Sequence, residues 1–166
     1  MHKLLIKMLF VITTIFIIIP LSNAKNTVPQ FSEYPVKSVY TGTTARLDIS
    51  DPDARMFRTR LNDALQQKAD FAGEYVTTMW GCGASCRMYS FVNKRTGKLL
   101  QAGFGGEENS EDVIATNPWS RLLVTQEEHM DQNYAVESLT VRFYVLENGE
   151  LKLIKTTKKA VTQEKN

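Results

Sequence analysis

The spacing of apolar side chains predicts one helix in the first half of the chain, over residues 51–69. Its apolar positions recur every three or four residues, the period of a helix that buries one face. The residues on that face are Phe57, Leu61, Ala64, Leu65 and Lys68. Ser50 or Asp51 can cap the N-terminus of the helix, and Pro52 suits its first turn.

From residue 74 onward the pattern alternates between apolar and polar positions, which predicts strands. The expected strands are residues 74–80, 87–92, 98–104, 121–125, 139–146 and 151–157, with a short further strand at 46–49. Asn148-Gly149 predicts a tight hairpin between the last two strands, and a turn at 93–97 joins an earlier pair. Residues 103–117 and 126–133 are expected to be loops. The pattern predicts an α+β domain with one N-terminal helix followed by a mainly antiparallel sheet of five or six strands.

The first 24 residues predict a secretory signal peptide. Lys3 and Lys7 precede an apolar run at residues 9–19, and Ser22-Asn23-Ala24 offers small residues for cleavage after Ala24. An uncleaved membrane anchor is the alternative, but the run is shorter than the roughly 20 apolar residues that span a bilayer. We therefore expect a periplasmic or secreted protein with no stable membrane span after cleavage. The expected organisation is a signal peptide at 1–24, an extended N-terminal segment at 25–45, a single α+β domain at 46–158 and a flexible basic tail at 159–166.

The net charge of the chain bears on which classes of binding partner can be expected. The full chain of 166 residues has 20 basic and 18 acidic side chains. Loss of the signal peptide would remove two lysines and leave 18 side chains of each sign. Because the remaining domain is neutral, its charge gives no reason to expect nucleic acid as a partner.

The two cysteines, Cys82 and Cys86, lie four positions apart beside two glycines. An oxidising compartment favours a disulfide between them, and the glycines allow the sharp turn that such a bond requires. Three other interpretations of the two cysteines have less support. The C-x-x-x-C spacing between two expected strands differs from the C-x-x-C at the start of a helix that redox-active pairs use. A thiol nucleophile needs a base and an orienting group. A zinc site needs three or four ligands, yet His129 is the only histidine after the signal peptide. We therefore expect no metal and no cofactor.

The segment 105–112 is a glycine-rich acidic loop. Paired carboxylates in such a loop can serve glycoside or cation chemistry. Solvated acidic side chains are the commoner outcome. The four acidic residues concerned are Glu107, Glu108, Glu111 and Asp112, of which Glu107 and Glu108 are candidate binding residues.

Aromatic side chains supply two further candidate binding residues, Trp80 and Tyr89. Both tryptophans, Trp80 and Trp119, are more often core or packing residues than platforms for a ligand. His129 is expected to lie at the surface. No catalytic residue can be assigned, because neither a G-x-S-x-G nor an H-E-x-x-H motif occurs.

Several motifs resemble those of an uncharacterised family of small exported bacterial proteins. The family combines a helix of the FRTRL kind with an FAGxY segment and a WGCGxxC motif, and here these occupy 57–61, 71–75 and 80–86. The segment SRLLV at 120–124 and the closing NGELKLI hairpin are similar as well. The resemblance covers most of the chain after the signal peptide. It implies export and a shared architecture, but it implies no activity and no catalytic residues.

Two functional hypotheses follow from these observations. The first is a non-enzymatic periplasmic binding domain, of an inhibitor- or immunity-like kind, with another periplasmic protein as the candidate partner. It rests on the small size of the domain, its expected export, its neutral net charge and the lack of a complete catalytic motif. The alternative is a periplasmic enzyme that acts on the cell wall or a small ligand through the acidic loop 105–112. A concave pocket where carboxylates meet polar groups favours the enzyme, and an exposed loop or apolar patch favours the binding domain.

Overall fold

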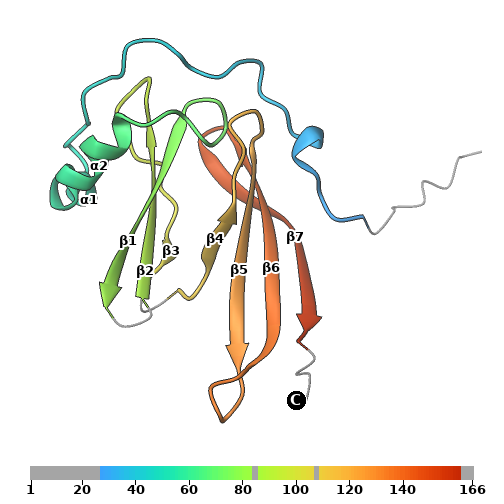
Figure 1. Cartoon of the computed structure of the whole chain (residues 1–166). Helices are drawn as coiled ribbons and strands as arrows, with labels where there is room; N and C mark the ends of the chain where they lie inside the picture. Colours follow the sequence, from blue (N-terminus) through green and yellow to red (C-terminus); the bar gives the residue numbers. More distant parts are fainter. Residues whose placement is uncertain (1–26, 84–85, 107–108, 162–166) are drawn as a thin grey trace, which may run out of the picture.

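Two consecutive antiparallel meanders form the body of the protein (Figure 1). The computed structural model describes residues 27–83, 86–106 and 109–161, so the predicted signal peptide lies outside the described residues. The first sheet has the order β1-β2-β3 and comprises β1 (Tyr75–Gly83), β2 (Cys86–Asn93) and β3 (Phe104–Gly105). The second sheet has the order β4-β5-β6-β7 and comprises β4 (Asp112–Ala115), β5 (Leu122–Met130), β6 (Val136–Glu147) and β7 (Glu150–Ala160). The mainly antiparallel architecture is confirmed, but the strands form two sheets instead of one sheet of five or six strands.

The predicted helix is divided into α1 (Pro52–Met56) and α2 (Arg58–Leu65). Asp51 caps α1, because its side chain accepts hydrogen bonds from the main-chain N–H groups of Asp53 and Ala54. Phe57 interrupts the helix with φ −103° and ψ 20°, and its ring packs 4.7 Å from the ring of Trp80. The helical segment therefore ends at Leu65 and not at residue 69.

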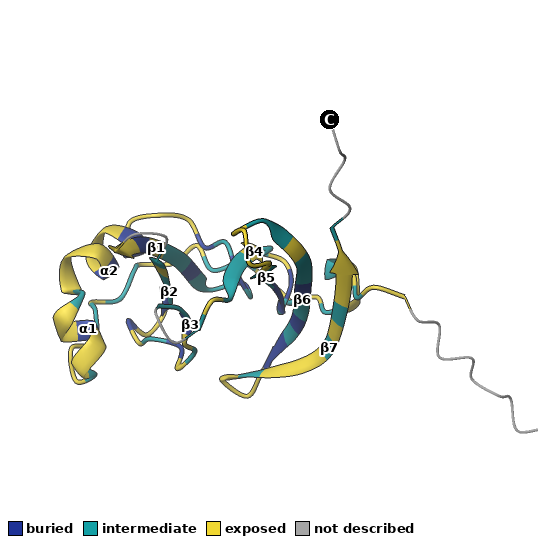
Figure 2. Ribbon diagram, turned by 90° about the horizontal axis from the view of Figure 1, so that it is seen from below, coloured by how far each residue is buried: buried dark blue, intermediate teal, exposed yellow. Residues whose placement is uncertain are grey.

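Apolar side chains gather in three clusters. The first lies between the helices and the first sheet and includes Leu61, Leu65, Val76 and Val92. The second joins the two sheets and includes Phe71, Phe91, Phe104, Leu123 and Leu146. The third lies on the second sheet and comprises Leu122, Val124, Phe143 and Val145, packed against Phe31 and Tyr34. The elements are thus layered, and Figure 2 shows the largely exposed α1 and α2 at the side of the first sheet.

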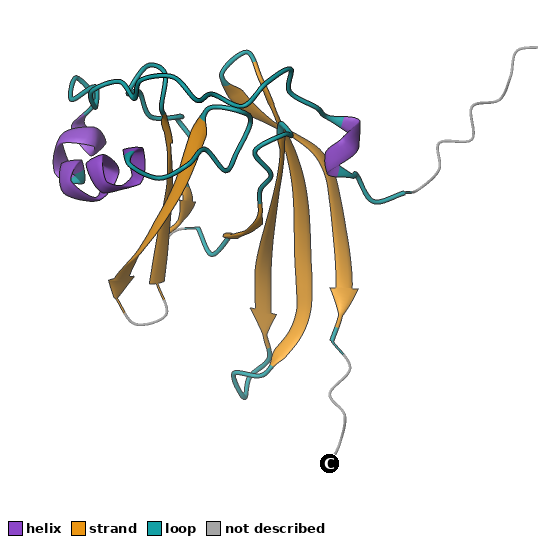
Figure 3. Cartoon of the chain, turned by 45° about the horizontal axis from the view of Figure 1, so that its top comes forward, coloured by secondary structure: helices purple, strands orange, loops and turns teal. Residues whose placement is uncertain are grey.

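The N-terminal segment runs across one end of both sheets (Figures 1 and 3). It contains a short 3-10 helix, η1 (Phe31–Glu33), and pairs with the segment before β5 through a bridge between Pro35 and Ser120. Further along, the main-chain N–H of Tyr40 donates to the carbonyl oxygen of Gly73 at 2.7 Å. This segment therefore connects the two sheets at that end of the molecule.

Four of the predicted loops and strands differ from the structure. Residues 98–104 contribute only β3 and an isolated bridge between Val92 and Leu99, because the chain bends where the N–H of Ala102 donates to the carbonyl oxygen of Leu100. The expected loop 103–117 contains β4, and the expected loop 126–133 is mostly β5, which continues to Met130 along β6. The run Gln126-Glu127-Glu128-His129 conceals the strand, since four consecutive polar residues show none of the apolar alternation that predicts a strand. Residues 46–49 form no strand.

The hairpin between β6 and β7 is confirmed. Asn148 and Gly149 have φ values of 52° and 83°, as a turn with two left-handed residues requires. The expected flexible tail at 159–166 begins inside β7, which extends to Ala160, and residues 162–166 lie outside the described residues. Within the described residues, every helix is too short and too polar to cross a membrane.

Candidate functional site

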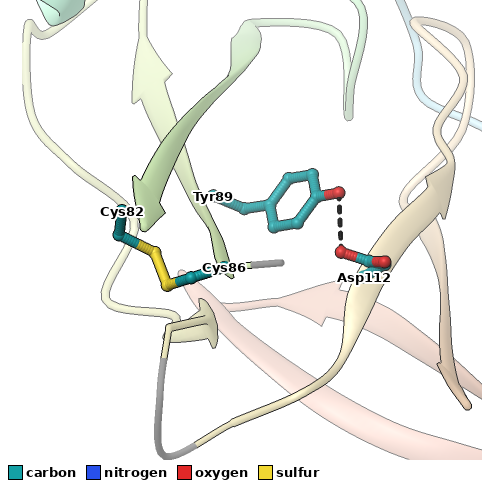
Figure 4. Close-up of a disulfide and its surroundings, with 4 residues drawn as sticks. All are labelled: Cys82, Cys86, Tyr89 and Asp112. Carbon is teal, nitrogen blue, oxygen red and sulfur yellow. Dashed lines mark hydrogen bonds between the residues drawn. A yellow bond between two sulfur atoms is a disulfide. The ribbon is translucent and has the colours of Figure 1, made fainter. Parts of the chain in front are cut away.

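The expected disulfide between Cys82 and Cys86 is present at the tip of the β1–β2 hairpin (Figure 4). The Cα atoms of the two cysteines lie 5.1 Å apart, and neither cysteine is free. Gly81, Cys82 and Gly83 are all exposed. The bond therefore closes a solvent-facing turn, and it leaves no thiolate for nucleophilic or redox chemistry.

The candidate binding residues Trp80 and Tyr89 lie on opposite faces of the first sheet. Trp80 lies opposite Met88 in the register, so the two side chains are on the same face of the sheet, the face that packs against the helices. Tyr89 follows Met88 in β2, so its side chain points to the other face. Trp80 is only 6 % exposed and lies between the ring of Phe57 and the guanidinium of Arg60. The interpretation of Trp80 as a core residue is confirmed. Trp80 and Tyr89 both line a cavity of about 330 Å³, to which the buried Trp80 contributes little exposed surface.

Tyr89 reaches from β2 toward the start of β4. Its hydroxyl donates to Asp112 Oδ1 at 3.0 Å, and Arg87 forms an ion pair with Asp112 Oδ2 at 3.3 Å (Figure 4). Burial and the neighbouring Asp112 carboxylate raise the pKa of the Tyr89 phenol. These contacts make Asp112 a link between the two sheets.

Glu111 makes the matching contacts with the second sheet. It accepts hydrogen bonds from Thr125 Oγ1 at 2.6 Å and from the Tyr144 hydroxyl at 3.1 Å. Arg142 Nη1 lies 3.0 Å from Glu111 Oε1 as an ion pair without hydrogen-bond alignment, so this buried Nη1 has no hydrogen-bond partner among the described residues. Burial, followed by the charge of Glu111, raises the pKa of Tyr144 to about 12.

Arg142 also binds Glu127 on the neighbouring strand, with Nη2 2.9 Å from Oε2. This hydrogen bond, aided by one from Ser110, lowers the pKa of the Glu127 carboxyl. Both described carboxylates of the acidic loop are therefore engaged in links between strands. The candidate residues Glu107 and Glu108 lie outside the described residues.

His129 lies on β5 and not in a loop, and its Nε2 is 2.7 Å from Thr140 Oγ1. The histidine is thus part of the polar face of the second sheet. Across the described ranges, no three histidine, cysteine, aspartate or glutamate side chains come together as metal ligands.

Four segments of the chain line a cavity of about 580 Å³. We call it the Trp119 pocket. Its volume lies within the range of roughly 300 to 1,000 Å³ that is typical of small-molecule sites. The lining residues come from the N-terminal segment at 39–44, residues 66–69 directly after α2, Lys94, and the turn that carries Pro118 and Trp119.

Trp119 is 60 % exposed, so the interpretation of this residue as a packing residue is wrong. Its main chain is nevertheless firmly held. Asn117 Oδ1 accepts from the Trp119 N–H at 2.7 Å, the Asn117 carbonyl accepts from the Ser120 N–H at 3.1 Å, and the Trp119 carbonyl accepts from the Val36 N–H at 3.0 Å. Pro118 occupies the second position of this turn, which its fixed φ favours. A rigid turn therefore presents an exposed indole ring.

Tyr40 forms a second aromatic part of the pocket. Its hydroxyl donates to the carbonyl oxygen of Thr43 at 2.8 Å, and the guanidinium carbon of Arg95 lies 4.4 Å from the ring centre. A Cβ atom at Gly42 would lie only 2.7 Å from the Tyr40 hydroxyl oxygen, so glycine permits this close approach. The orientation of the ring is thus fixed before any ligand arrives.

Lys94 is the charged residue of the pocket that is buried, with 8 % of its surface exposed. Its ammonium group donates to the main-chain carbonyl oxygens of Leu65 and Gln67 at the end of α2. A cation is favoured there because the final carbonyls of a helix carry partial negative charge. Sequence reasoning placed Lys94 in a hairpin turn and gave it no role, since its partners are main-chain atoms far along the chain.

Comparisons of the chain with protein-family models, curated proteins and solved structures found no match. The resemblance to small exported bacterial proteins therefore stays a prediction.

Proposed function

We propose that this protein is a non-enzymatic binding protein of an extracytoplasmic compartment, and that it holds a small molecule in the Trp119 pocket. The observation that carries the proposal is the exposed indole of Trp119 on a turn held by main-chain hydrogen bonds. An exposed aromatic ring on a rigid frame loses little conformational entropy when it packs against a ligand.

The rest of the pocket supports the same function. Val39, Pro118 and the two aromatic rings offer apolar surface, while Gln66 and Gln67 offer amides that can orient a ligand. Small-molecule sites typically combine apolar walls with a few placed polar groups. The disulfide supports the proposed compartment, because such bonds persist mainly in oxidising environments.

The enzyme hypothesis draws no support from the described part of the acidic loop. Glu111 and Asp112 are each held by a tyrosine and an arginine in contacts between strands. A glycosidase needs two carboxyl groups facing the same bond. The inhibitor- or immunity-like role, with another periplasmic protein as partner, stays a prediction.

A fragment screen on the exported protein tests the proposed function. Small aromatic and aliphatic compounds are added to the ¹⁵N-labelled protein, and backbone chemical shifts are followed. We expect hits that shift residues 39–44, 66–69 and 118–119 together and that lose binding in Trp119→Ala. Tyr134→Ala is the matched control, because Tyr134 is an aromatic residue with 86 % exposure that does not line the pocket. Hits that bind Trp119→Ala unchanged, or no hits at these residues, would refute the proposal.

A further inference from the structure

We infer that the Trp119 pocket is selective for a small carboxylate with an apolar or aromatic body, an inference that rests on the proposed function. The ligand body packs on Trp119, and its carboxylate accepts a hydrogen bond from the ammonium group of Lys94. Three observations carry this inference: the charges of the lining residues, the hydrogen bonds of Lys94 and the surroundings of the neighbouring arginine.

The charged residues that line the pocket are two lysines, Lys68 and Lys94, and none of the described lining residues is acidic. Lys68 is exposed at the rim, whereas Lys94 is buried. The next carboxyl along the chain, Asp70, lines a different cavity, where it accepts hydrogen bonds from Thr77. The pocket therefore has a positive character that complements an anion.

Lys94 has the capacity to bind that anion. An ammonium group has three N–H donors. Two of them serve the carbonyl oxygens of Leu65 and Gln67. In the described part of the chain, Lys94 has no carboxylate partner. Burial of a charge without an opposite charge is costly, and the helix end supplies only about half a charge. A carboxylate at the third donor completes the neutralisation.

Arg95 does not compete for this role. Its guanidinium stacks on the Tyr40 ring, and its Nε donates to Glu74 at 2.8 Å. Glu74 thus neutralises Arg95. The positive charges of Lys68 and Lys94 therefore remain without an opposite charge among the described residues, and the third N–H of Lys94 is the buried donor that a ligand can use. One negative charge matches this arrangement, whereas a phosphate dianion would call for additional donors.

Calorimetric titration with 4-phenylbutyrate and 4-phenylbutyramide tests the inference. The two probes share the phenyl group and chain and differ in the charge of the head group. We expect the carboxylate to bind at least about tenfold more tightly than the amide, since hydrogen bonds to charged groups exceed neutral ones by this order. Trp119→Ala should weaken the binding of both compounds.

Two lysine variants refine the test without disturbing Lys94. Lys68→Gln should weaken 4-phenylbutyrate binding severalfold and leave the amide unchanged. Lys98→Gln, at an exposed lysine outside the pocket, should change neither affinity. Equal affinities of acid and amide would overturn the carboxylate selectivity while leaving the proposed function standing. Failure of both probes to bind would overturn the inference, and an empty fragment screen in addition would overturn the proposed function.

Discussion

The ammonium nitrogen of Lys94 lies 2.6 Å from the main-chain carbonyl oxygen of Gln67. The same ammonium group donates to the carbonyl of Leu65, the last residue of α2. A side chain from the residue directly after β2 thereby caps a helix that ends more than 25 residues earlier in the sequence. The contact fixes one wall of the Trp119 pocket to the first sheet, so the pocket and the helix end depend on the same residue.

Lys94→Met should therefore destabilise the protein. The substitution keeps an apolar stem of similar length but leaves the helix carbonyls without their charged donor, which costs about 2 to 4 kcal/mol of unfolding free energy. Urea denaturation followed by circular dichroism measures the loss. Lys98→Met is the control, because Lys98 is exposed and should change stability by less than about 0.5 kcal/mol. Equal effects of the two substitutions would show that Lys94 does not support the helix.

A second prediction concerns the helix face packed on the first sheet. Leu61 is fully buried in the first apolar cluster, so Leu61→Ala should cost about 2 to 5 kcal/mol. Met56 belongs to the adjacent helix but is 72 % exposed. Met56→Ala should therefore cost less than about 0.5 kcal/mol in the same urea melts. A larger loss for Met56→Ala than for Leu61→Ala would mean that the helices pack by a different face.

The disulfide should contribute modestly, because it closes a very short loop at an exposed hairpin tip. The double substitution Cys82→Ala/Cys86→Ala should lower the unfolding free energy by about 2 kcal/mol while leaving the circular dichroism spectrum recognisable. Thiol titration of the unreduced wild-type protein is the necessary control and should find no free thiol. Two titratable thiols in the native protein would contradict the bond itself.

Stability should fall in acid partly through Glu127. Its hydrogen bond with Arg142 lowers the pKa of Glu127 in the folded protein below the usual 4.5. The stabilisation is therefore complete above about pH 4.5, the unfolded value, and is lost as the pH falls through the lower folded value. Glu127→Gln should cost about 1 to 2 kcal/mol at pH 7, and its difference from the wild type should shrink toward pH 3.

Glu128→Gln provides the control for this pH dependence. Glu128 is exposed on the same strand, so its substitution should change stability little at either pH. A constant difference between wild type and Glu127→Gln from pH 7 to pH 3 would show that the Arg142 hydrogen bond is not the source of the acid sensitivity.

The sequence predicted those elements that depend on residues close together along the chain. The Asn148-Gly149 turn required left-handed residues at both positions, and the spacing of Leu61, Ala64 and Leu65 identified the buried helix face. β4 was missed because it is only four residues long, and the extension of β5 was missed because residues 126–129 are an unbroken polar run without apolar alternation. The side chain of Arg142 on β6 binds both Glu127 and Glu111, a contact between distant segments that no local pattern indicates.

The Trp119 pocket could not be predicted from the sequence, because its walls come from segments that are distant along the chain. Nothing local to Lys94 indicates that it binds the end of α2, since its acceptors are main-chain carbonyls. The one available signal was Asn117-Pro118, which predicts a turn and therefore places Trp119 at the surface. Because tryptophan is usually buried, the residue type alone led to the wrong expectation that Trp119 is a packing residue.

The most direct test of the central claim is ¹⁹F NMR of the protein labelled with 5-fluorotryptophan. The two tryptophans give two resonances, which Trp119→Phe assigns, and the buried Trp80 serves as an internal control. When 4-phenylbutyrate is added, we expect a saturable shift of the Trp119 resonance and no shift of the Trp80 resonance. An unchanged Trp119 resonance at millimolar ligand, or equal shifts of both resonances, would contradict binding at the Trp119 pocket.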